Sequence, residues 1–238
     1  MTSKFLATNL IILFAFFFRS FSGFGGALLS IPLLAILFPL KFIIPVESLL
    51  EVGLSAMLLP SVIRRADRSS IPLLVGGSFI GCTVGVYFLN ALANDQLKVP
   101  LGIVIIVLAL SLLRNKATIL TGLKGLGLPV GIFGGVLGGL FGTSGPAYIA
   151  YLSSRGLKKE VFRSTLIVIF TFENLWRLSL YVWDGLLTRN ELEFAISLTP
   201  ILILATYLGH LSQLQINEKT FRRIIVILLL FSGIFQIF

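Results

Sequence analysis

The sequence predicts an all-α integral membrane protein made of two repeated halves that are inverted relative to each other. Hydrophobic residues make up 56% and charged residues 12% of the 238-residue chain, whereas soluble domains average roughly 25% charged residues. Several long apolar runs come close to the ~20 residues that a helix needs to cross the hydrocarbon core. These runs do not alternate as barrel strands do, so the predicted spans are helices.

Each half, residues 1–120 and 121–238, is predicted to contain three ordinary spans within a single membrane domain. The spans cover approximately 42–63, 71–93 and 97–113 in the first half, and 164–183, 192–211 and 221–238 in the second. Near the start of each half lies an apolar segment that glycines interrupt. The two interrupted segments are SGFGGA at 22–27 and FGTSGP at 141–146. Internal repeats of this kind are common in secondary transporters.

The interrupted segments decide the predicted topology. Residues 5–38 as one straight helix would be about 51 Å long, against a hydrocarbon core of ~30 Å, so the helix must break between Arg19 and Gly26. If each broken segment crosses once, the loop Lys and Arg residues divide eight to nine between the two sides. If each re-enters as a hairpin, they divide thirteen to four, and the four are Lys4, Lys41, Lys98 and Arg189. Only the second division follows the positive-inside rule, which predicts six spans, two re-entrant hairpins and both termini outside.

Charge and cysteine content exclude other classes of protein. The net charge of +9 comes from Lys and Arg that gather in loops, so it is a topology signal and predicts no nucleic-acid partner. The single cysteine, Cys82, excludes an intramolecular disulfide framework and a cysteine-rich metal site. It lies beside Gly81 and Gly85, where we expect it to pack as a small residue. The sequence predicts no cofactor.

Six groups of residues, spread over essentially the whole chain, resemble one family. They are Gly23 to Gly26 with Pro32, Arg64 to Asp67, Gly139 to Pro146, Phe162 to Thr165, Asn174 to Arg177 with Tyr181, and Phe221 to Arg223 before Ser232 and Gly233. Their order and spacing resemble the TauE/SafE permeases, known as sulfite exporters. The resemblance implies transport of small sulfur-containing anions such as sulfite or sulfoacetate. The chain departs from the family at Gly142 to Gly145, where hydroxyls stand in a cluster that is often all glycine.

The two glycine clusters are the predicted anion site. A helix that restarts inside the membrane points its positive N-terminal end and its unpaired N–H groups at the break, and glycine lets an anion approach the backbone closely. Hydroxyls nearby would add donors. The alternative is that these glycines only permit tight helix packing. The predicted cluster residues are Ser20, Ser22, Gly23, Gly25, Gly26, Gly142, Thr143, Ser144 and Gly145.

Charged residues within apolar segments are functional candidates because a charge in the bilayer is costly. Arg19 directly precedes the first break, and we expect it to neutralise the substrate or to brace the hairpin. Glu173 and Arg177 are four residues apart, share a helix face and can pair, with Asn174 beside them. We assign Asn174 and Arg177 to the substrate, and Glu51 and Glu173 to ion coupling.

Two further ionisable residues are given structural positions. Glu47 is expected at the level of the lipid headgroups, and His210, the one histidine, at the membrane interface.

The sequence therefore predicts a secondary transporter, and the family resemblance implies that it exports a small sulfur-containing anion across the bacterial inner membrane. Its partners would be the anion, the lipid bilayer and a coupled proton or sodium ion. No Gly-rich Lys-Ser/Thr nucleotide motif occurs, and no nucleophile–base pair or metal site suggests an enzyme. The alternative is an ion channel or cation-selective permease that uses the paired glycine loops as a filter.

Overall fold

The computed structural model describes residues 2–22, 24–113 and 125–211, together with 226–227, 229–231 and 234. All regular elements assigned in these ranges are helices, which confirms the predicted all-α class. They are α1 (Thr2–Ser22), α2 (Gly26–Leu34), α3 (Leu40–Val62), the 3-10 turn η1 (Ile63–Arg65), α4 (Ile71–Ala91), α5 (Asn94–Leu113), α6 (Gly127–Phe141), α7 (Gly145–Ser154), α8 (Lys159–Trp183) and α9 (Arg189–Leu211).

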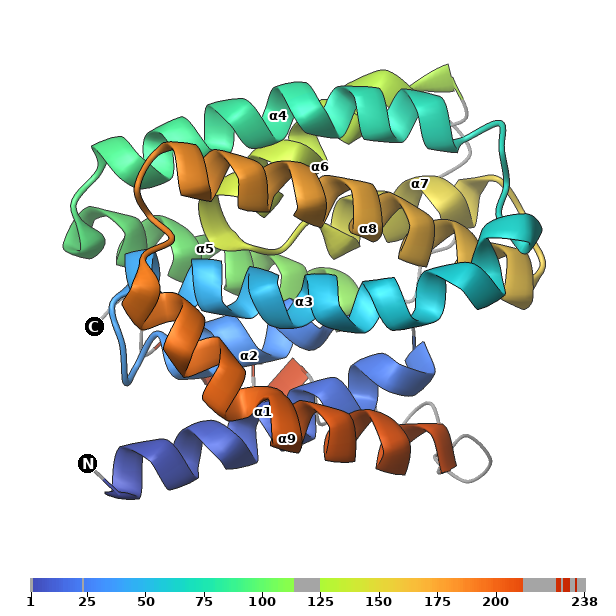
Figure 1. Cartoon of the computed structure of the whole chain (residues 1–238). Coiled ribbons are helices and arrows are strands. Elements are labelled where there is room, and N and C mark those ends of the chain that lie inside the picture. Colours follow the sequence, from blue (N-terminus) through green and yellow to red (C-terminus); the bar gives the residue numbers. More distant parts are fainter. Residues whose placement is uncertain are drawn as a thin grey trace.

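The long helices form a bundle whose axes run broadly along one direction (Figure 1). Five helices in the described part are long and apolar enough to cross a membrane, namely α1, α3, α4, α8 and α9. The predicted spans at 42–63, 71–93, 97–113, 164–183 and 192–211 correspond to α3, α4, α5, α8 and α9. Helices α5, α8 and α9 begin three to five residues earlier than predicted. The predicted span at 221–238 lies for the most part outside the described residues.

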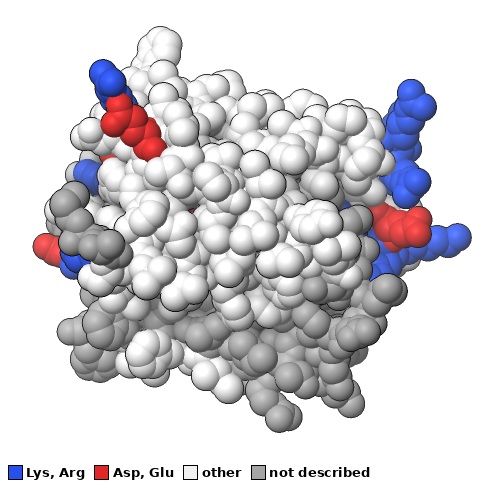
Figure 2. Space-filling model, turned by 60° about the horizontal axis from the view of Figure 1, so that its bottom comes forward, with Lys and Arg blue, Asp and Glu red and all other residues white. Residues whose placement is uncertain are grey.

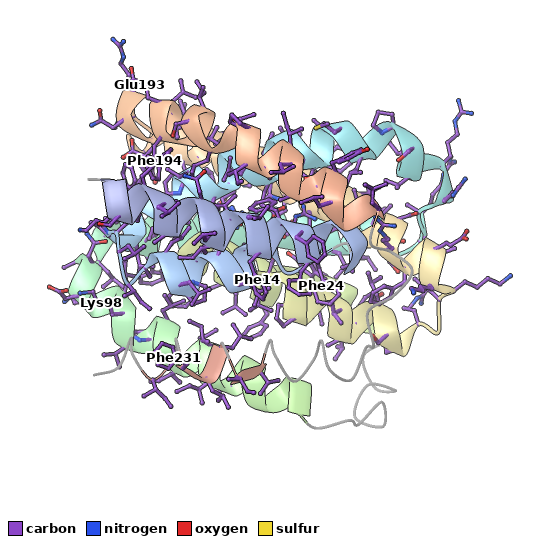
Figure 3. All side chains as sticks on the ribbon, turned by 90° about the horizontal axis from the view of Figure 1, so that it is seen from below. Phe14, Phe24, Lys98, Glu193, Phe194 and Phe231 are labelled. Atoms are coloured by element: carbon purple, nitrogen blue, oxygen red, sulfur yellow. The ribbon has the colours of Figure 1, made fainter. Side chains whose placement is uncertain are left out.

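Charged side chains gather at two opposite ends of the bundle, and a broad uncharged belt separates them on the face that Figure 2 shows. Lys98 and Glu193 lie at one end (Figure 3), and the Lys41 ammonium donates a hydrogen bond of 2.7 Å to the Asn90 carbonyl near the α4–α5 turn. Ser69 lies in the loop between η1 and α4, and its Oγ accepts a hydrogen bond of 2.8 Å from Arg155. The uncharged belt is the surface that a bilayer requires of a membrane-spanning bundle.

Both predicted breaks occur where the glycines are. Gly25 precedes α2 with φ 99°, and Gly142 ends α6 with φ 71°, a left-handed backbone conformation that favours glycine. The helices that restart, α2 and α7, have 9 and 10 residues, or about 14 and 15 Å at ~1.5 Å per residue. Each is therefore about half as long as the ~30 Å hydrocarbon core is thick.

Helices α4 and α6 pack backbone to backbone along a seam of six glycines, three from each helix. These are Gly77, Gly81 and Gly85 of α4, and Gly131, Gly135 and Gly139 of α6. A Cβ built on any of them would fall within about 3 Å of the facing backbone. Cys82 is fully buried on α4, as its predicted role in packing requires.

The last turn of α1 is held from two sides. Ser20 Oγ donates to the Thr206 carbonyl of α9 at 2.9 Å. From α8, Arg163 Nη2 donates to the Ser20 carbonyl at 2.7 Å. These bonds position the end of α1, and with it Arg19, against the second half of the chain.

Candidate functional site

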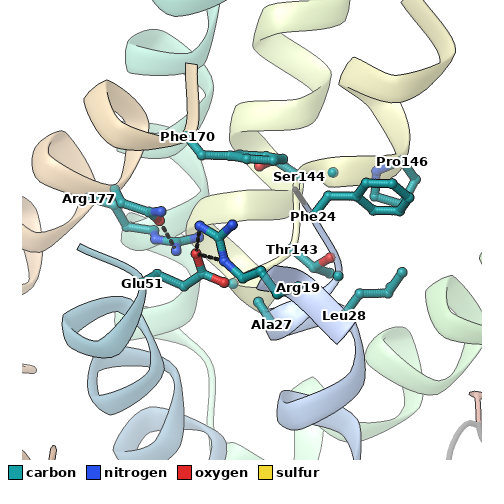
Figure 4. Close-up of a pocket in the computed structure, with 14 residues that line it drawn as sticks. Arg19, Phe24, Ala27, Leu28, Glu51, Thr143, Ser144, Pro146, Phe170 and Arg177 are labelled. Atoms are coloured by element: carbon teal, nitrogen blue, oxygen red, sulfur yellow. Dashed lines mark hydrogen bonds and ion pairs between the residues drawn. The ribbon is translucent and has the colours of Figure 1, made fainter. Parts of the chain in front are cut away.

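A small cavity lies where the two glycine breaks meet (Figure 4). Its volume is about 30 Å³, room for on the order of one to three waters and therefore for a small ligand only. Residues from α1, the first break, α2, α3, the second break, α7 and α8 enclose it. They are Arg19, Phe24, Gly25, Ala27, Leu28, Glu51, Gly142, Thr143, Ser144, Gly145, Pro146, Phe170, Asn174 and Arg177.

The first guanidinium of the cavity is Arg19, in the last turn of α1. Its Nε donates to Glu51 Oε2 at 2.5 Å, and its Nη2 also pairs with that oxygen. Nη2 donates to Ser55 Oγ at 3.2 Å as well. Arg19 and Glu51 are 1% and 6% exposed, so this is a buried ion pair, and such a pair survives because each charge satisfies the other.

The second guanidinium is Arg177 of α8, which is 2% exposed. Its Nη1 donates to the Gly138 carbonyl at 2.6 Å, and its Nη2 donates to Asn174 Oδ1. Its Nε has no hydrogen-bond partner among the described residues. All the hydrogen-bond acceptors that the described residues offer Arg177 are neutral, and the carboxyls of Glu173 and Glu47 act on it without forming an ion pair. An anion in the cavity can therefore pair with it directly.

Two helix N-termini also face the cavity. Gly25, which precedes α2, lines it on one side, and Ser144 and Gly145, which open α7, line it on another. A helix N-terminus carries a partial positive charge equivalent to about half an elementary charge. Two guanidinium groups and two helix ends therefore converge on one buried space, and this arrangement suits an anion.

The cavity also has an apolar wall, whose residues were not among those predicted from the sequence. Phe24, Ala27, Leu28, Pro146 and Phe170 line it, and the ring centroid of Phe170 lies 6.0 Å from Cζ of Arg19, within cation–π range. Phe24 and Pro146 lie inside the glycine clusters themselves. Phe170 is four residues before Asn174 on α8, so the spacing of a helix face could have found it.

Eight of the twelve predicted substrate residues line this cavity: Arg19, Gly25, Gly142, Thr143, Ser144, Gly145, Asn174 and Arg177. Ser20 points its hydroxyl to α9 instead. Gly26 lies behind the ion pair, because a Cβ on it would stand 2.5 Å from Glu51 Oε1 and 2.7 Å from Arg19 Cδ. Gly23 and the Ser22 side chain fall outside the described residues, as does the His210 side chain.

Two more carboxyl groups are buried behind the cavity, one in each half. Ser30 Oγ of α2 donates to Glu47 Oε1 at 2.9 Å, and Tyr148 of α7 donates to Glu173 Oε2 at 2.5 Å. The second oxygen of each carboxyl has no hydrogen-bond partner in the described part of the chain. Each acid therefore ties a short helix to the long helix that follows it.

Two expectations about these acids differ from the structure. Glu47 is 1% exposed, so protein encloses it and it does not contact lipid headgroups, while its depth in the bilayer stays a prediction. Glu173 and Arg177 share the buried face of α8, but the ion pairs found among the described residues do not include this one. Arg177 binds Asn174 one turn earlier instead. Periodicity predicts which face a side chain occupies, but not which of several nearby partners it takes.

Comparison with known proteins gives two matches. The family model described as sulfite exporter TauE/SafE matches residues 9–235. A protein of Cupriavidus necator, described as a probable sulfite/organosulfonate exporter TauE, is 28% identical over 215 residues, which cover 87% of this chain and 84% of that protein. No solved structure matches the chain.

Proposed function

The chain belongs to the sulfite exporter TauE/SafE family and is a multi-pass protein of the cell membrane, and we propose that it exports a small sulfur oxyanion. Sulfite or a short organosulfonate would bind in the cavity between the two glycine breaks. The observation that carries this proposal is Arg177, a buried guanidinium in the cavity wall that has only neutral hydrogen-bond acceptors.

The charge of the cavity wall favours an anion. Two cations, Arg19 and Arg177, and one carboxylate, Glu51, line the cavity, so these three side chains sum to one positive charge. This positive charge attracts a monoanion, whose oxygens would meet Arg177, Asn174 and the N–H groups at the start of α7. A cation filter would need carbonyls or carboxylates in excess here, so the composition of the wall argues against the channel alternative.

The transport cycle would be alternating access around this site. We propose that α1–α2 and α6–α7 are re-entrant hairpins belonging to two inverted repeats, as the division of loop charges predicts. Support comes from the half-length helices α2 and α7 and from the separation of charged side chains into two ends. A coupled proton or sodium ion would act at Glu51 or Glu173, the two acids nearest Arg19 and Arg177.

Cysteine labelling tests this topology. With re-entrant hairpins, Lys41→Cys and Lys158→Cys are expected to react with a membrane-impermeant thiol reagent from opposite sides of the membrane. If each broken segment crossed once, both positions would be reached from the same side. Arg64→Cys is the internal control, because one span separates it from Lys41 and it should therefore react from the side opposite Lys41 in either arrangement. The native Cys82 is buried.

Ligand-dependent thermal stability of the detergent-solubilised protein tests the substrate class. We expect sulfite or sulfoacetate to raise the unfolding temperature more than sulfate, phosphate, acetate or sodium at matched ionic strength and pH. A ligand at about 100 times its dissociation constant adds about 2.7 kcal/mol. Ser144→Ala, which removes a hydroxyl from the cavity wall, should reduce this stabilisation by weakening binding severalfold.

A matched serine provides the control for that measurement. Ser197 is exposed on α9 and bonds only the Phe194 carbonyl among the described residues, so Ser197→Ala should leave anion-dependent stabilisation unchanged. Stabilisation by sodium alone, with no response to any anion, would overturn the proposed substrate class.

A further inference from the structure

We propose that Glu51 is an internal counter-anion that the substrate must displace, and that it takes up a proton when this happens. One anion would then bind together with one proton. This inference rests on the proposed anion site and specifies how that site is coupled to an ion. It assigns the coupling role to Glu51 and not to Glu173.

The position of Glu51 is that of a bound anion. Its carboxylate pairs with Arg19 through Oε2. Its other oxygen, Oε1, lies beside the first residue of α2, only 2.5 Å from where a Cβ on Gly26 would be. The carboxylate therefore occupies both positive groups of the first half, the guanidinium and the N-terminal end of α2.

The second half offers the same groups, but among the described residues no carboxylate forms an ion pair with its guanidinium, although the buried Glu173 carboxyl lies on the same helix. Glu51 follows the buried Glu47 by four residues on α3, and Arg177 follows the buried Glu173 by four residues on α8. Where the first half presents a carboxylate, the second half therefore presents a cation. A Cβ on Gly145, at the start of α7, would meet only the Phe170 ring, at 3.7 Å. The substrate can therefore bind first at Arg177 and the start of α7. It can bind Arg19 only after the Arg19–Glu51 ion pair has broken.

The charged groups around Glu51 explain why a proton is needed. From the packed elements these are Arg19 of α1, Glu47 of α3 itself, and Glu173 and Arg177 of α8. Helix α2 carries no charged residue, and α9 faces α3 with apolar and threonine side chains. The charged residues of α5, Asp95 and Lys98, are exposed at the end of the bundle.

A carboxylate released from Arg19 would remain buried near Glu47, Glu173 and the incoming anion, all of which disfavour its negative charge. Protonation removes this conflict. One proton adds to the Glu51 carboxylate, giving a neutral carboxylic acid, while the oxyanion takes its place on Arg19. When the anion leaves, the proton dissociates and the Arg19–Glu51 pair forms again. The proton and the anion would thus cross together, and the gradient of the anion would drive export.

The experiment measures the affinity of purified protein for isethionate, a sulfonate that has no titrating group near neutral pH, by calorimetry. Wild-type protein should bind more tightly as the pH falls, by up to tenfold per pH unit if one proton is taken up with each anion. Titrations in two buffers with different ionisation enthalpies should show uptake of about one proton per anion bound. No proton uptake by protein that binds isethionate would overturn the proposal.

The isosteric variants assign the carboxyl group. Glu51→Gln removes the internal anion, so its affinity should be independent of pH and at least as tight as the tightest affinity that wild type reaches at low pH. Glu173→Gln, whose parent carboxyl bonds Tyr148 and not Arg19, should retain the pH dependence. Loss of the pH dependence in Glu173→Gln alone would move the coupling role there and contradict the proposal.

The two proposals fail in different ways. If wild-type protein binds neither isethionate nor sulfite at any pH, the proposed function is wrong. If it binds them with the same affinity at every pH, the anion site stands and the role of Glu51 is wrong. The proton-uptake measurement needs only wild-type protein, so the test does not depend on the folding of Glu51→Gln.

Discussion

Replacing Gly81 with alanine should destabilise this protein more than any other single methyl group added to α4. A Cβ at Gly81 would overlap the Ile132 carbonyl oxygen and would lie 2.8 Å from the Val136 nitrogen. Both are backbone atoms in α6, so no side chain can rotate away, and α4 and α6 must separate along the seam. Overpacking of this kind typically destabilises the folded state by about 1–3 kcal/mol. Because the backbone of α6 cannot move aside as a side chain can, we expect Gly81→Ala at or above the upper end of this range.

The same helix supplies the matched control. A Cβ on Gly76 meets no atom within 4 Å, so Gly76→Ala should be neutral or should stabilise α4 by up to about 1 kcal/mol through helix propensity. Thermal unfolding of both variants in the same detergent measures the difference. Equal unfolding temperatures for Gly81→Ala and Gly76→Ala would show that the seam is not closely packed.

Replacing Arg177 should abolish the response to anions while leaving Arg19 in place. Arg177→Gln keeps some of the hydrogen-bonding capacity toward Asn174 and the Gly138 carbonyl, but removes the one charge in the cavity wall that pairs with neutral acceptors. Removal of one partner from a buried charged contact typically costs 2–5 kcal/mol of binding free energy, a weakening of about 30-fold to 5,000-fold. Stabilisation by sulfite, measured as a shift in unfolding temperature, should therefore disappear.

Two further variants distinguish the effect of the charge at Arg177 from its geometry and from the loss of an arginine elsewhere. Arg177→Lys keeps the charge without the planar fork, so it should recover part of the sulfite response. Arg189 is exposed at the start of α9 and pairs with Glu193, so Arg189→Gln should bind sulfite as wild type does. If Arg177→Gln responds to sulfite as wild type does, the anion does not use this guanidinium.

The helices could be predicted from the sequence because the membrane imposes a length on each apolar run. α3 and α4 begin within two residues of the predicted starts, since the loops on either side are short. The prediction that 5–38 forms one broken unit located the break, but it did not foresee that α1 alone has the length of a span. The inverted repeat and the re-entrant hairpins stay predictions, which the labelling experiment addresses.

The site was predictable where a residue type is costly in lipid, and less so where it is not. Arg19, Glu51 and Arg177 stood out because charge is rare in apolar helices, and the structure brings all three to one cavity. Phe170 and Leu28 carry no such signal, because apolar residues are common throughout this chain. The enclosure of Glu47 was not predicted because its distance in sequence from the helix start does not reveal that a second helix, α2, covers it.

Arg19 forms an ion pair with Glu51, whereas Arg177 forms none among the described residues. This difference affects how the carrier responds to the membrane potential. In the empty site Arg19, Arg177 and Glu51 sum to one positive charge. With a bound monoanion and a proton on Glu51, the site again sums to one positive charge. Both forms of the carrier would then feel the membrane potential equally, although that potential does about 2.3 kcal/mol of work per charge for each 100 mV. The rate of sulfonate exchange in vesicles would therefore respond to pH and to the anion gradient, and very little to voltage.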